Sequence, residues 1–352
     1  MLKMGVIGWG GMGHFHHRTV RDKIARMETK GVYDINPAKK DDILEHGLIA
    51  YESADALLQD PEIDLVLVGT PNNFHKEYAI RALKAGKHVL CEKPVMMDSA
   101  ELEEVIAVAE ETGKIFTVHQ NRRWDRDFLI VKDVYDKGTI GKPFFIESRV
   151  QGARGIPGDW RCTKVAGGGM MLDWGVHLID QLLWMIDSPV VEIYAQVLKL
   201  KYEEVDDNFK MMMKFENGIN ALIEIGTHHF TNLPRWYINC DAGSMRINDW
   251  SSGADIVKEL KTEIDWEMSV VYTAAGPTRT MAGRPDGTTE EFHIDIEEEK
   301  RNHELHEMLV DAIETGDHSK VAVKHNELRR SMKVMEAAFK SSEEGIVIKE
   351  RI

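Results

Sequence analysis

The fold of the N-terminal part of the chain is decided by the stretch KMGVIGWGGMG, residues 3–13. Its first five residues form a short apolar run that predicts a strand, and the pattern after the stretch predicts a helix. Between the two stands G-x-G-x-x-G, in the setting that this fingerprint requires for binding a dinucleotide. Gly8 permits the tight turn, Gly10 lets the backbone approach a pyrophosphate, and Gly13 lets the helix pack closely on the strand.

The next predicted strand, Gly31 to Ile35, contains an acidic residue, Asp34. In dinucleotide-binding folds, a carboxylate about 20 residues after the fingerprint accepts hydrogen bonds from the adenosine ribose and disfavours a 2′-phosphate. The sequence therefore predicts NAD as the cofactor, with NADP less favoured. The other interpretation, which the sequence leaves open, is a glycine-rich turn followed by a solvated aspartate.

Strand–helix units continue to about residue 118. Residues 64–69 and 115–118 have the pattern of buried strands, and VLCEKP, residues 89–94, has the pattern of a strand that ends in a charged pair. This alternation predicts a doubly wound parallel sheet, an α/β fold whose ligand lies beyond the carboxyl ends of the strands. The bond between Lys93 and Pro94 is a candidate cis peptide. The residues expected on the ligand-binding rim are Thr70, Pro71, Asn72, Glu92, Lys93 and Asn121.

The pattern changes after residue 122, which predicts two domains, residues 1–122 and 123–352. Residues 209–215 alternate apolar and polar side chains, and Asn217-Gly218 predicts a tight turn into a second alternating strand. Residues 236–240 and 244–248 predict another hairpin, and two amphipathic helices close the chain. These features predict an α+β domain with a mostly antiparallel open sheet. We expect residues 248–291 to be irregular, and the sequence leaves open whether they form a lid, an arm that reaches another subunit or a plain loop.

A second candidate for chemistry lies on a largely apolar helix predicted from Met170 to about Ile186. Asp173 and His177 are spaced i and i+4, so an α-helix would place them on one face. Imidazole exchanges protons near neutral pH, and Asp173 or Asp180 would orient it. The alternative is a histidine–aspartate pair that satisfies itself in the core.

Composition and charge limit the kinds of binding partner, and the cellular compartment, that we expect for this chain. The net charge of −15 argues against a nucleic acid or an anionic membrane as partner. No apolar run approaches the ~20 residues that span a bilayer, and a first strand at about Lys3 predicts no signal or transit peptide. Cys91, Cys162 and Cys240 are few and scattered, which fits a reducing compartment, so we expect a cytoplasmic protein.

Two histidine-containing patterns could hold a metal, and we interpret neither as a metal site. His14, His16 and His17 follow the fingerprint closely, and we interpret them as residues on helix faces. Asp173 and His177 have the spacing of metal ligands, but no third strong ligand accompanies them in the sequence. The prediction is therefore that the chain holds no metal.

Four motifs occur in one order along the chain. They are the fingerprint, Thr70-Pro71-Asn72 with His75, GKHVLCEKP at residues 86–94, and G-x-x-x-D-x-G-x-H at residues 169–177. Together they resemble the Gfo/Idh/MocA oxidoreductase family, and the resemblance covers nearly the whole chain. It implies a Rossmann domain followed by an α/β domain whose open sheet mediates a homodimer or homotetramer. It also implies NAD(P)-dependent hydride transfer at a secondary hydroxyl of a sugar, glycoside or cyclitol such as inositol.

The resemblance also implies roles for matching residues. Lys93, Asp173 and His177 would form the catalytic group, and the sequence leaves open whether the lysine or the histidine is the base. Substrate contacts are expected from the same three residues together with Arg123 and Trp160, and the pocket is expected to be shaped by residues 152–160 and 228–237. Cofactor contacts are expected from Gly8, Trp9, Gly10, Gly11, Met12, Gly13, Asp34, Thr70, Pro71, Asn72, His75, Glu92, Lys93, Asn121, Trp160 and Arg161.

Two other functions exist among proteins with this resemblance. Some relatives hold NAD tightly and use transient oxidation to cleave glycosides, and net formation of NADH would argue against that activity here. Others sense a dinucleotide without catalysis and can lack the lysine or the histidine. This chain has Lys93, Asp173 and His177, which disfavours a non-catalytic regulator.

Overall fold

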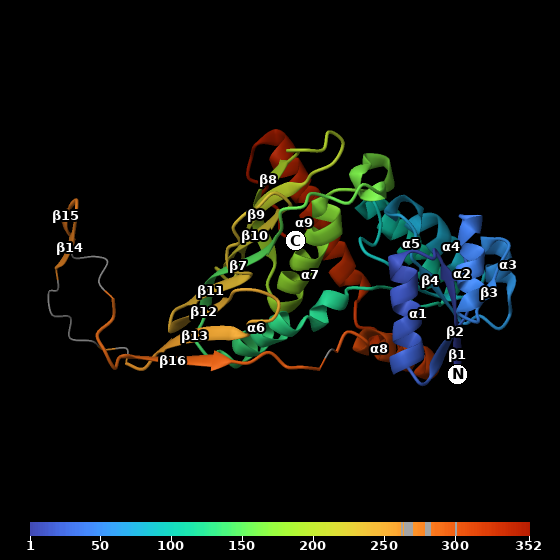
Figure 1. Cartoon of the computed structure of the whole chain (residues 1–352), viewed down its shortest axis with the longest axis horizontal. Helices are drawn as coiled ribbons and strands as arrows, with labels where there is room; N and C mark the ends of the chain where they lie inside the picture. Colours follow the sequence, from blue (N-terminus) through green and yellow to red (C-terminus); the bar gives the residue numbers. More distant parts are fainter. Residues whose placement is uncertain (262, 264–269, 279–282, 300) are drawn as a thin grey trace.

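The computed structural model describes residues 1–261, 263, 270–278, 283–299 and 301–352. Two large sheets lie side by side, each with its own helices, and a helical stretch from the C-terminal part of the chain reaches back to the N-terminal sheet (Figure 1). The core is built mainly from the apolar strands and from the helix faces that cover them.

The N-terminal sheet has six parallel strands in the order β3-β2-β1-β4-β5-β6. The central strand β4 reads Leu-Val-Leu-Val and is buried at every position, as expected for a parallel strand covered on both faces. The predicted parallel α/β sheet is confirmed. The strands are β1 (Leu2–Ile7), β2 (Met27–Tyr33), β3 (Ile49–Ala50), β4 (Leu65–Val68), β5 (His88–Cys91) and β6 (Phe116–Val118).

Local capping signals set the ends of the helices between these strands. The Ser53 side chain accepts a hydrogen bond from the backbone of Ala56, and that of Asp98 accepts one from the backbone of Glu101. Gly113, at a φ of 64°, ends the helix that Asp98 begins. The helices are α1 (Gly11–Lys23), α2 (Lys40–Glu45), α3 (Ala54–Gln59), α4 (His75–Lys84) and α5 (Ser99–Thr112).

The second sheet has eight strands in the order β16-β13-β12-β11-β7-β10-β9-β8. Neighbouring strands are antiparallel except β7 and β10, which are parallel. Asn217-Gly218 joins β9 to β10 as predicted, with Gly218 at a φ of 92°. The strands are β7 (Pro143–Gln151), β8 (Val190–Leu198), β9 (Asn208–Phe215), β10 (Asn220–Gly226), β11 (Trp236–Cys240), β12 (Gly243–Ile247), β13 (Ala254–Glu259) and β16 (Thr289–Ile294).

Helices of the C-terminal part join the second sheet to the first. On one face of the second sheet lie α6 (Arg126–Lys137), α7 (Val176–Met185) and α9 (His325–Glu344) (Figure 1). The last of these is tied to β8, because Ser341 and Ser342 accept hydrogen bonds from that strand's backbone. By contrast, α8 (Glu304–Thr315) lies against α1, where Arg26 pairs with Glu307 and Asp311.

One expectation from the sequence changes here. Residues 248–291 are not irregular throughout, because β13 and β16 extend the second sheet and β14 (Val271–Thr273) pairs with β15 (Gly276–Thr278) away from the body (Figure 1). The alternation of buried Ala254 and Ile256 was an available signal for β13. The domain boundary between residues 122 and 123 stays a prediction. Although α8 follows the second sheet in the chain, it lies beside the first sheet. Among the described helices, none is long and apolar enough to cross a membrane.

Candidate active site

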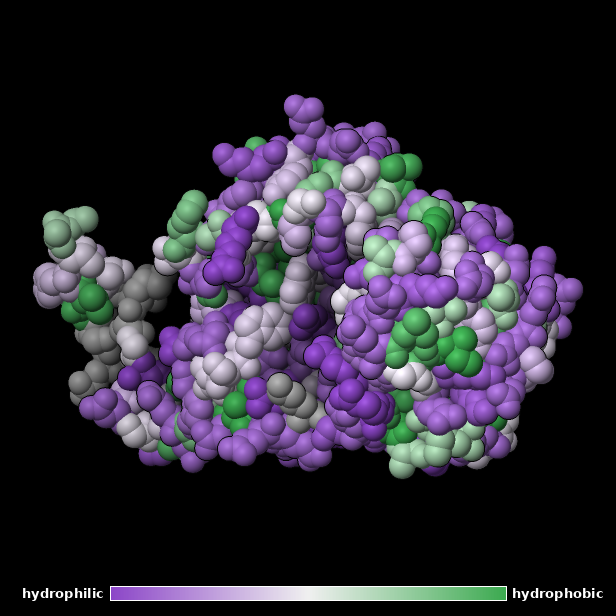
Figure 2. Space-filling view, turned by 45° about the vertical axis from the view of Figure 1, so that its right-hand side comes forward, coloured by the Kyte–Doolittle hydropathy of each residue, from purple (hydrophilic) through white to green (hydrophobic). Residues whose placement is uncertain are grey.

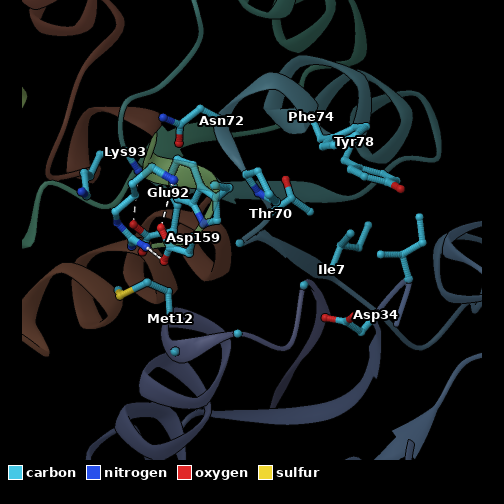
Figure 3. A pocket seen from close by; sticks show the side chains of 18 of the residues that line it. Ile7, Met12, Asp34, Thr70, Asn72, Phe74, Tyr78, Glu92, Lys93 and Asp159 are labelled. Carbon is cyan, nitrogen blue, oxygen red and sulfur yellow. Dashed lines mark hydrogen bonds and ion pairs between the residues drawn. The ribbon is translucent and has the colours of Figure 1, made fainter. Parts of the chain in front are cut away.

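A cavity of about 600 Å³ opens at the carboxyl ends of β1, β4 and β5 (Figure 3). This is where the strand order reverses between β1 and β4, the place at which parallel α/β sheets bind ligands. The cavity is lined by Ile7, Gly8, Gly10, Gly11, Met12, Tyr33, Asp34, Ile35, Gly69, Thr70, Pro71, Asn72, Phe74, Tyr78, Glu92, Lys93, Asp159, Trp160, Arg161 and Asp173. Charged side chains gather at one end, around Lys93, and Asp34 lies at the other (Figure 3).

The fingerprint turn is built on close backbone approaches. A Cβ on Gly8, whose φ is +101°, would lie 2.5 Å from the carbonyl oxygen of Gly69, and a Cβ on Gly13 would lie 2.4 Å from that of Gly8. Gly10 and Gly11 instead face open space on the cavity wall. The turn therefore presents bare backbone at the N-terminus of α1, the arrangement that receives a pyrophosphate.

Trp9 differs from its expected role, because its indole points away from the cavity. The side chain is fully buried and donates through Nε1 to the Asp42 carboxylate at 2.8 Å. Its backbone N–H donates to Asp34 Oδ2 at 2.6 Å. Trp9 thus anchors the turn to the end of β2 and does not line the cavity.

Asp34 sits on the cavity wall with its carboxylate held by the backbone. Besides the Trp9 amide on Oδ2, its Oδ1 accepts from the amide of Asn36 at 2.8 Å. The side chain of Ile35 beside it is 81 % exposed on the same wall, and Phe74 and Tyr78 form a tilted pair of rings with centroids 6.4 Å apart. The sequence analysis did not single out Ile35, Phe74 or Tyr78; the i, i+4 spacing of the two aromatic residues beside the Thr-Pro-Asn motif was an available signal.

Lys93 and Asp173 meet at the other end of the cavity. Lys93 Nζ donates to Asp173 Oδ1 and to the Asp173 carbonyl oxygen, each at 2.8 Å. Arg161 Nε lies 3.6 Å from the same Oδ1, and the Arg161 guanidinium also donates to Asp159 at 2.7 Å. Burial alone would raise the pKa of Asp173, but the Lys93 and Arg161 charges outweigh it and hold the pKa below its usual value. Asp173 is therefore ionised between two cations. The Lys93–Pro94 bond is cis, as expected.

His177 is more deeply buried than Asp173, and 4 % of its surface is exposed. Its Nδ1 donates to Gln120 Oε1 at 3.2 Å, which leaves the lone pair of the neutral ring on Nε2. Burial lowers the pKa of His177 well below its usual value, and the nearby Lys93 and Arg122 charges lower it further. The imidazole is thus neutral and has a defined tautomer.

The expected partners of His177 were wrong, and the local backbone explains why. Residues 171–175 form a π-helical turn before α7 begins, so Asp173 and His177 are not stacked as i, i+4 residues of an α-helix would be. Asp173 pairs with Lys93, and Asp180 pairs with Arg123 instead. Gln120, which the sequence analysis did not single out, orients the imidazole. No local pattern marks it, because the two residues lie on different elements.

Three further residues expected at the site lie elsewhere. His75 is fully buried behind the cavity, where its two ring nitrogens lie 2.9 and 3.1 Å from the carbonyl oxygens of Pro94 and Thr70, so the ring can donate to one of them and it positions the walls. Asn121 lines a separate hollow with Trp124. Arg123 is 1 % exposed and forms a two-point ion pair with Asp180, at 2.7 and 2.8 Å, in the core. The expectation that Arg123 contacts substrate is corrected, because its charge is fully engaged.

A second cavity, of about 390 Å³, adjoins the first and shares Arg161 and Asp173 with it. It is lined by Val150, Gln151, Gly152, Ala153, Arg154, Gly155, Ile156, Pro157, Arg161, Met170, Asp173, Trp174, Ile225, Gly226 and Thr227. Much of the expected loop, residues 152–160, therefore shapes a pocket. Arg235 and Trp236 do not, since both are buried and pair with Asp127 in the core. On the surface, the two halves of the molecule meet at a hollowed, largely hydrophilic face (Figure 2).

Comparison with known proteins finds a matching family model for each of the two parts of the chain. Residues 2–120 match the family model described as the oxidoreductase family, NAD-binding Rossmann fold, GFO_IDH_MocA. Residues 128–246 match the model of the GFO/IDH/MocA C-terminal domain. The chain belongs to the GFO/IDH/MocA family. It is therefore an oxidoreductase of that family, with a Rossmann fold for a nicotinamide dinucleotide.

Several of the chain's relatives within the GFO/IDH/MocA family are named for their reactions, as inositol dehydrogenases. The chain is 30 % identical over 233 residues to the myo-inositol 2-dehydrogenase of Thermotoga maritima, covering 63 % of this chain and 68 % of that protein. It is 28 % identical over 244 residues to the scyllo-inositol 2-dehydrogenase (NADP(+)) of Bacillus subtilis, covering 68 % and 66 %. A solved NAD-binding protein from Listeria innocua is 41 % identical, covers 99 % of both chains and superposes with a TM-score of 0.93.

Proposed function

We propose that this chain is an NAD-dependent dehydrogenase that transfers a hydride between nicotinamide and a secondary hydroxyl, or the matching ketone, of a sugar, glycoside or cyclitol. The observation that carries the proposal is the Lys93–Asp173 pair at the junction of the two cavities. Lys93 lies on the wall of the first cavity, and Asp173 lies on the walls of both. A reacting hydroxyl placed at this junction would contact the ammonium group and still face a cofactor in the first cavity.

The residues of the first cavity fit a dinucleotide. The open backbone at Gly10 and Gly11 would receive the pyrophosphate, and Asp34 would accept from the adenosine ribose. The nicotinamide would then lie toward the lysine end, near Asn72 and Trp160. When bound, the dinucleotide supplies the hydride acceptor or donor for the reaction.

Lys93, Asp173 and His177 have separate roles toward the substrate oxygen. The Lys93 ammonium donates a hydrogen bond to that oxygen and stabilises negative charge that develops on it. Asp173 holds the ammonium in place and balances its charge. The neutral His177 lines neither cavity, but the lone pair on its Nε2 makes it our candidate for the group that takes the hydroxyl proton.

The second cavity suits a hydroxylated substrate. Its wall combines hydrogen-bonding groups, Gln151, Thr227 and Arg154, with the apolar surface of Trp174. Sugars and cyclitols present both polar edges and apolar ring faces, so such a wall can contact both. The names of the two inositol dehydrogenases among the relatives support this substrate class.

We also propose that the protein is a homodimer or homotetramer joined through the open sheet, as the resemblance implied. The face of the second sheet opposite its buried side carries exposed apolar side chains. Tyr194 is 38 %, Met212 43 % and Val257 40 % exposed, each on a different strand, and the strand registers place all three on this face. Apolar residues that gather on one face support burial against another copy.

Replacing Asp34 by asparagine should erase the preference for NAD. The wild-type protein is expected to bind NADH more tightly than NADPH, because the Asp34 carboxylate accepts from the ribose and repels a phosphate. Loss of a charge-assisted hydrogen bond is worth about 10- to 100-fold in affinity, so the ratio of the two dissociation constants should shift by about that factor. Fluorescence titration with NADH and NADPH measures this without knowledge of the substrate.

The matched control for this change is Asp41→Asn, an exposed acidic residue at the start of α2. It removes the same charge from the same region and should leave both dissociation constants unchanged. Tighter binding of NADPH than of NADH by the wild-type protein would contradict the proposed role of Asp34.

A further inference from the structure

Three histidines from distant parts of the chain meet in the core beside Glu92. His16 comes from α1, His119 follows β6, and His306 comes from α8. All three are fully buried, and one ring nitrogen of each lies within 4.8 Å of the others. The sequence predicts a helix-face position for His16 and shows no connection with residues more than 100 positions away. Burying three imidazoles is unfavourable unless their nitrogen atoms find partners.

Glu92 determines where the ring protons lie. Its Oε1 faces His16 Nε2 at 2.8 Å and His119 Nδ1 at 2.9 Å. A carboxylate only accepts hydrogen bonds, so both facing nitrogens carry a proton. The second nitrogens of these two rings, His16 Nδ1 and His119 Nε2, are left to accept a hydrogen bond or to bind a metal.

Two of the remaining ring nitrogens in the cluster have no hydrogen-bond partner among the described residues. His16 Nδ1 faces His306 Nε2 at 2.8 Å, so the His306 ring donates there and has its own lone pair on Nδ1. His119 Nε2 and His306 Nδ1 are both buried and have no hydrogen-bond partner among the residues that the structure describes. A metal ion binds imidazole through a ring nitrogen that carries a lone pair, so these unpartnered nitrogens are possible ligand atoms.

We propose that His16, His119 and His306 form a binding site for a divalent transition metal of the Zn²⁺ type. Imidazole is a preferred ligand of such ions, and metal-bound histidines commonly donate their second ring N–H to a carboxylate, as His16 and His119 do to Glu92. At Zn–N distances of about 2.0–2.1 Å, two ligand nitrogens of a tetrahedral ion lie roughly 3.3 Å apart. The metal would replace the hydrogen bond between His16 Nδ1 and His306 Nε2, the His306 ring would carry its proton on Nδ1 instead, and the two ligand nitrogens would move apart by roughly half an ångström.

The site would link α1 to α8 and hold both beside the end of β5, where Glu92 and Lys93 lie. Its ligands fix α8 onto α1, and Glu92 immediately precedes Lys93. A metal there would hold this corner together and set the position of the residue next to the catalytic lysine. We assign the metal a structural role, because all three histidines are fully buried in the core and Glu92 holds the second ring nitrogen of His16 and of His119.

The test is metal content after expression of the full chain with added Zn²⁺, followed by dialysis against metal-free buffer. Elemental analysis is expected to find about one Zn²⁺ per chain. Expression with Co²⁺ in place of Zn²⁺ adds a spectroscopic readout, because ligand geometry determines the visible spectrum of Co²⁺, and a four-coordinate site with nitrogen ligands is expected. This readout uses the wild-type protein and does not depend on the folding of any variant.

Two variants locate the metal. His306→Gln removes one ligand, so the amount of retained metal should fall at least about tenfold. The metal raises the melting temperature of the wild-type protein, and in this variant that rise should shrink as well. His14→Gln alters the other group of potential ligands, His14, Asp42 and His46, which is partly exposed, and should retain the metal fully. Wild-type protein that keeps no metal, or equal retention by His306→Gln, would overturn the proposal. So would loss of the metal in His14→Gln alone.

Discussion

Replacement of Lys93 by alanine should reduce turnover by about a thousandfold or more and leave the affinity for NADH within a few-fold of the wild-type value. The ammonium group is proposed to contact the substrate oxygen as negative charge develops on it. Removing one such donor typically costs 10²–10³ in rate, and loss of a group that also helps proton transfer costs more. Lys93 also holds Asp173 through two 2.8 Å hydrogen bonds, so its loss disturbs the junction of the cavities.

The matched control for Lys93 is Lys76→Ala on α4, where the lysine is partly exposed and pairs with Glu104 at the surface. It should leave both turnover and NADH affinity unchanged. NADH affinity measured by fluorescence separates a chemical role of Lys93 from a role in cofactor binding. Turnover of Lys93→Ala close to that of the wild-type protein would mean that the catalytic roles are wrongly assigned.

Removal of the Asp180 carboxylate by Asp180→Ala should destabilise the protein by about 3–5 kcal/mol. The substitution leaves the guanidinium of Arg123 buried without its two-point partner, since Arg123 is 1 % exposed. The pair also joins the segment Asn121–Trp124 to α7, the helix that carries His177. The urea concentration at the midpoint of unfolding, followed by circular dichroism, measures the effect.

Two companion variants identify the cause of that loss. Asp133→Ala removes a carboxylate that pairs with Lys137 at the surface of α6, and its midpoint should match that of the wild-type protein. The double variant Arg123→Met/Asp180→Leu removes both charges and fills similar volume, so it should recover most of the stability. If the double variant were as unstable as Asp180→Ala, lost packing rather than an unpaired charge would be responsible.

Much of the fold could be predicted because its signals are local. The fingerprint, the buried run of β4 and the Asn217-Gly218 turn each lie within a few residues, and the structure contains all three as expected. The Lys93–Asp173 contact needed more than local patterns, since 80 residues separate the two. That the two belong to one catalytic group was expected only from the family resemblance that the four motifs carry.

What the sequence did not predict depends on contacts between distant segments or on local departures from regular helix geometry. The π turn before α7 separates Asp173 from His177, and a helical spacing rule assumes that no such turn exists. Arg123 carries the same charge whether it faces a substrate or Asp180, and only the fold decides between them. The histidine cluster joins His16 to His306, residues at opposite ends of the chain, so no pattern in the sequence shows it.

The most direct test of the account is formation of reduced nicotinamide, followed by absorbance, from NAD or NADP with a panel of inositols, aldoses, anhydrosugars and glycosides. We predict net reduction of NAD by at least one cyclitol or sugar of the panel, with NADP a poorer acceptor, and loss of that activity in Lys93→Ala. Cleavage of a glycoside without net reduction of NAD would contradict the proposed dehydrogenase. So would tight binding of NAD without turnover of any member of the panel.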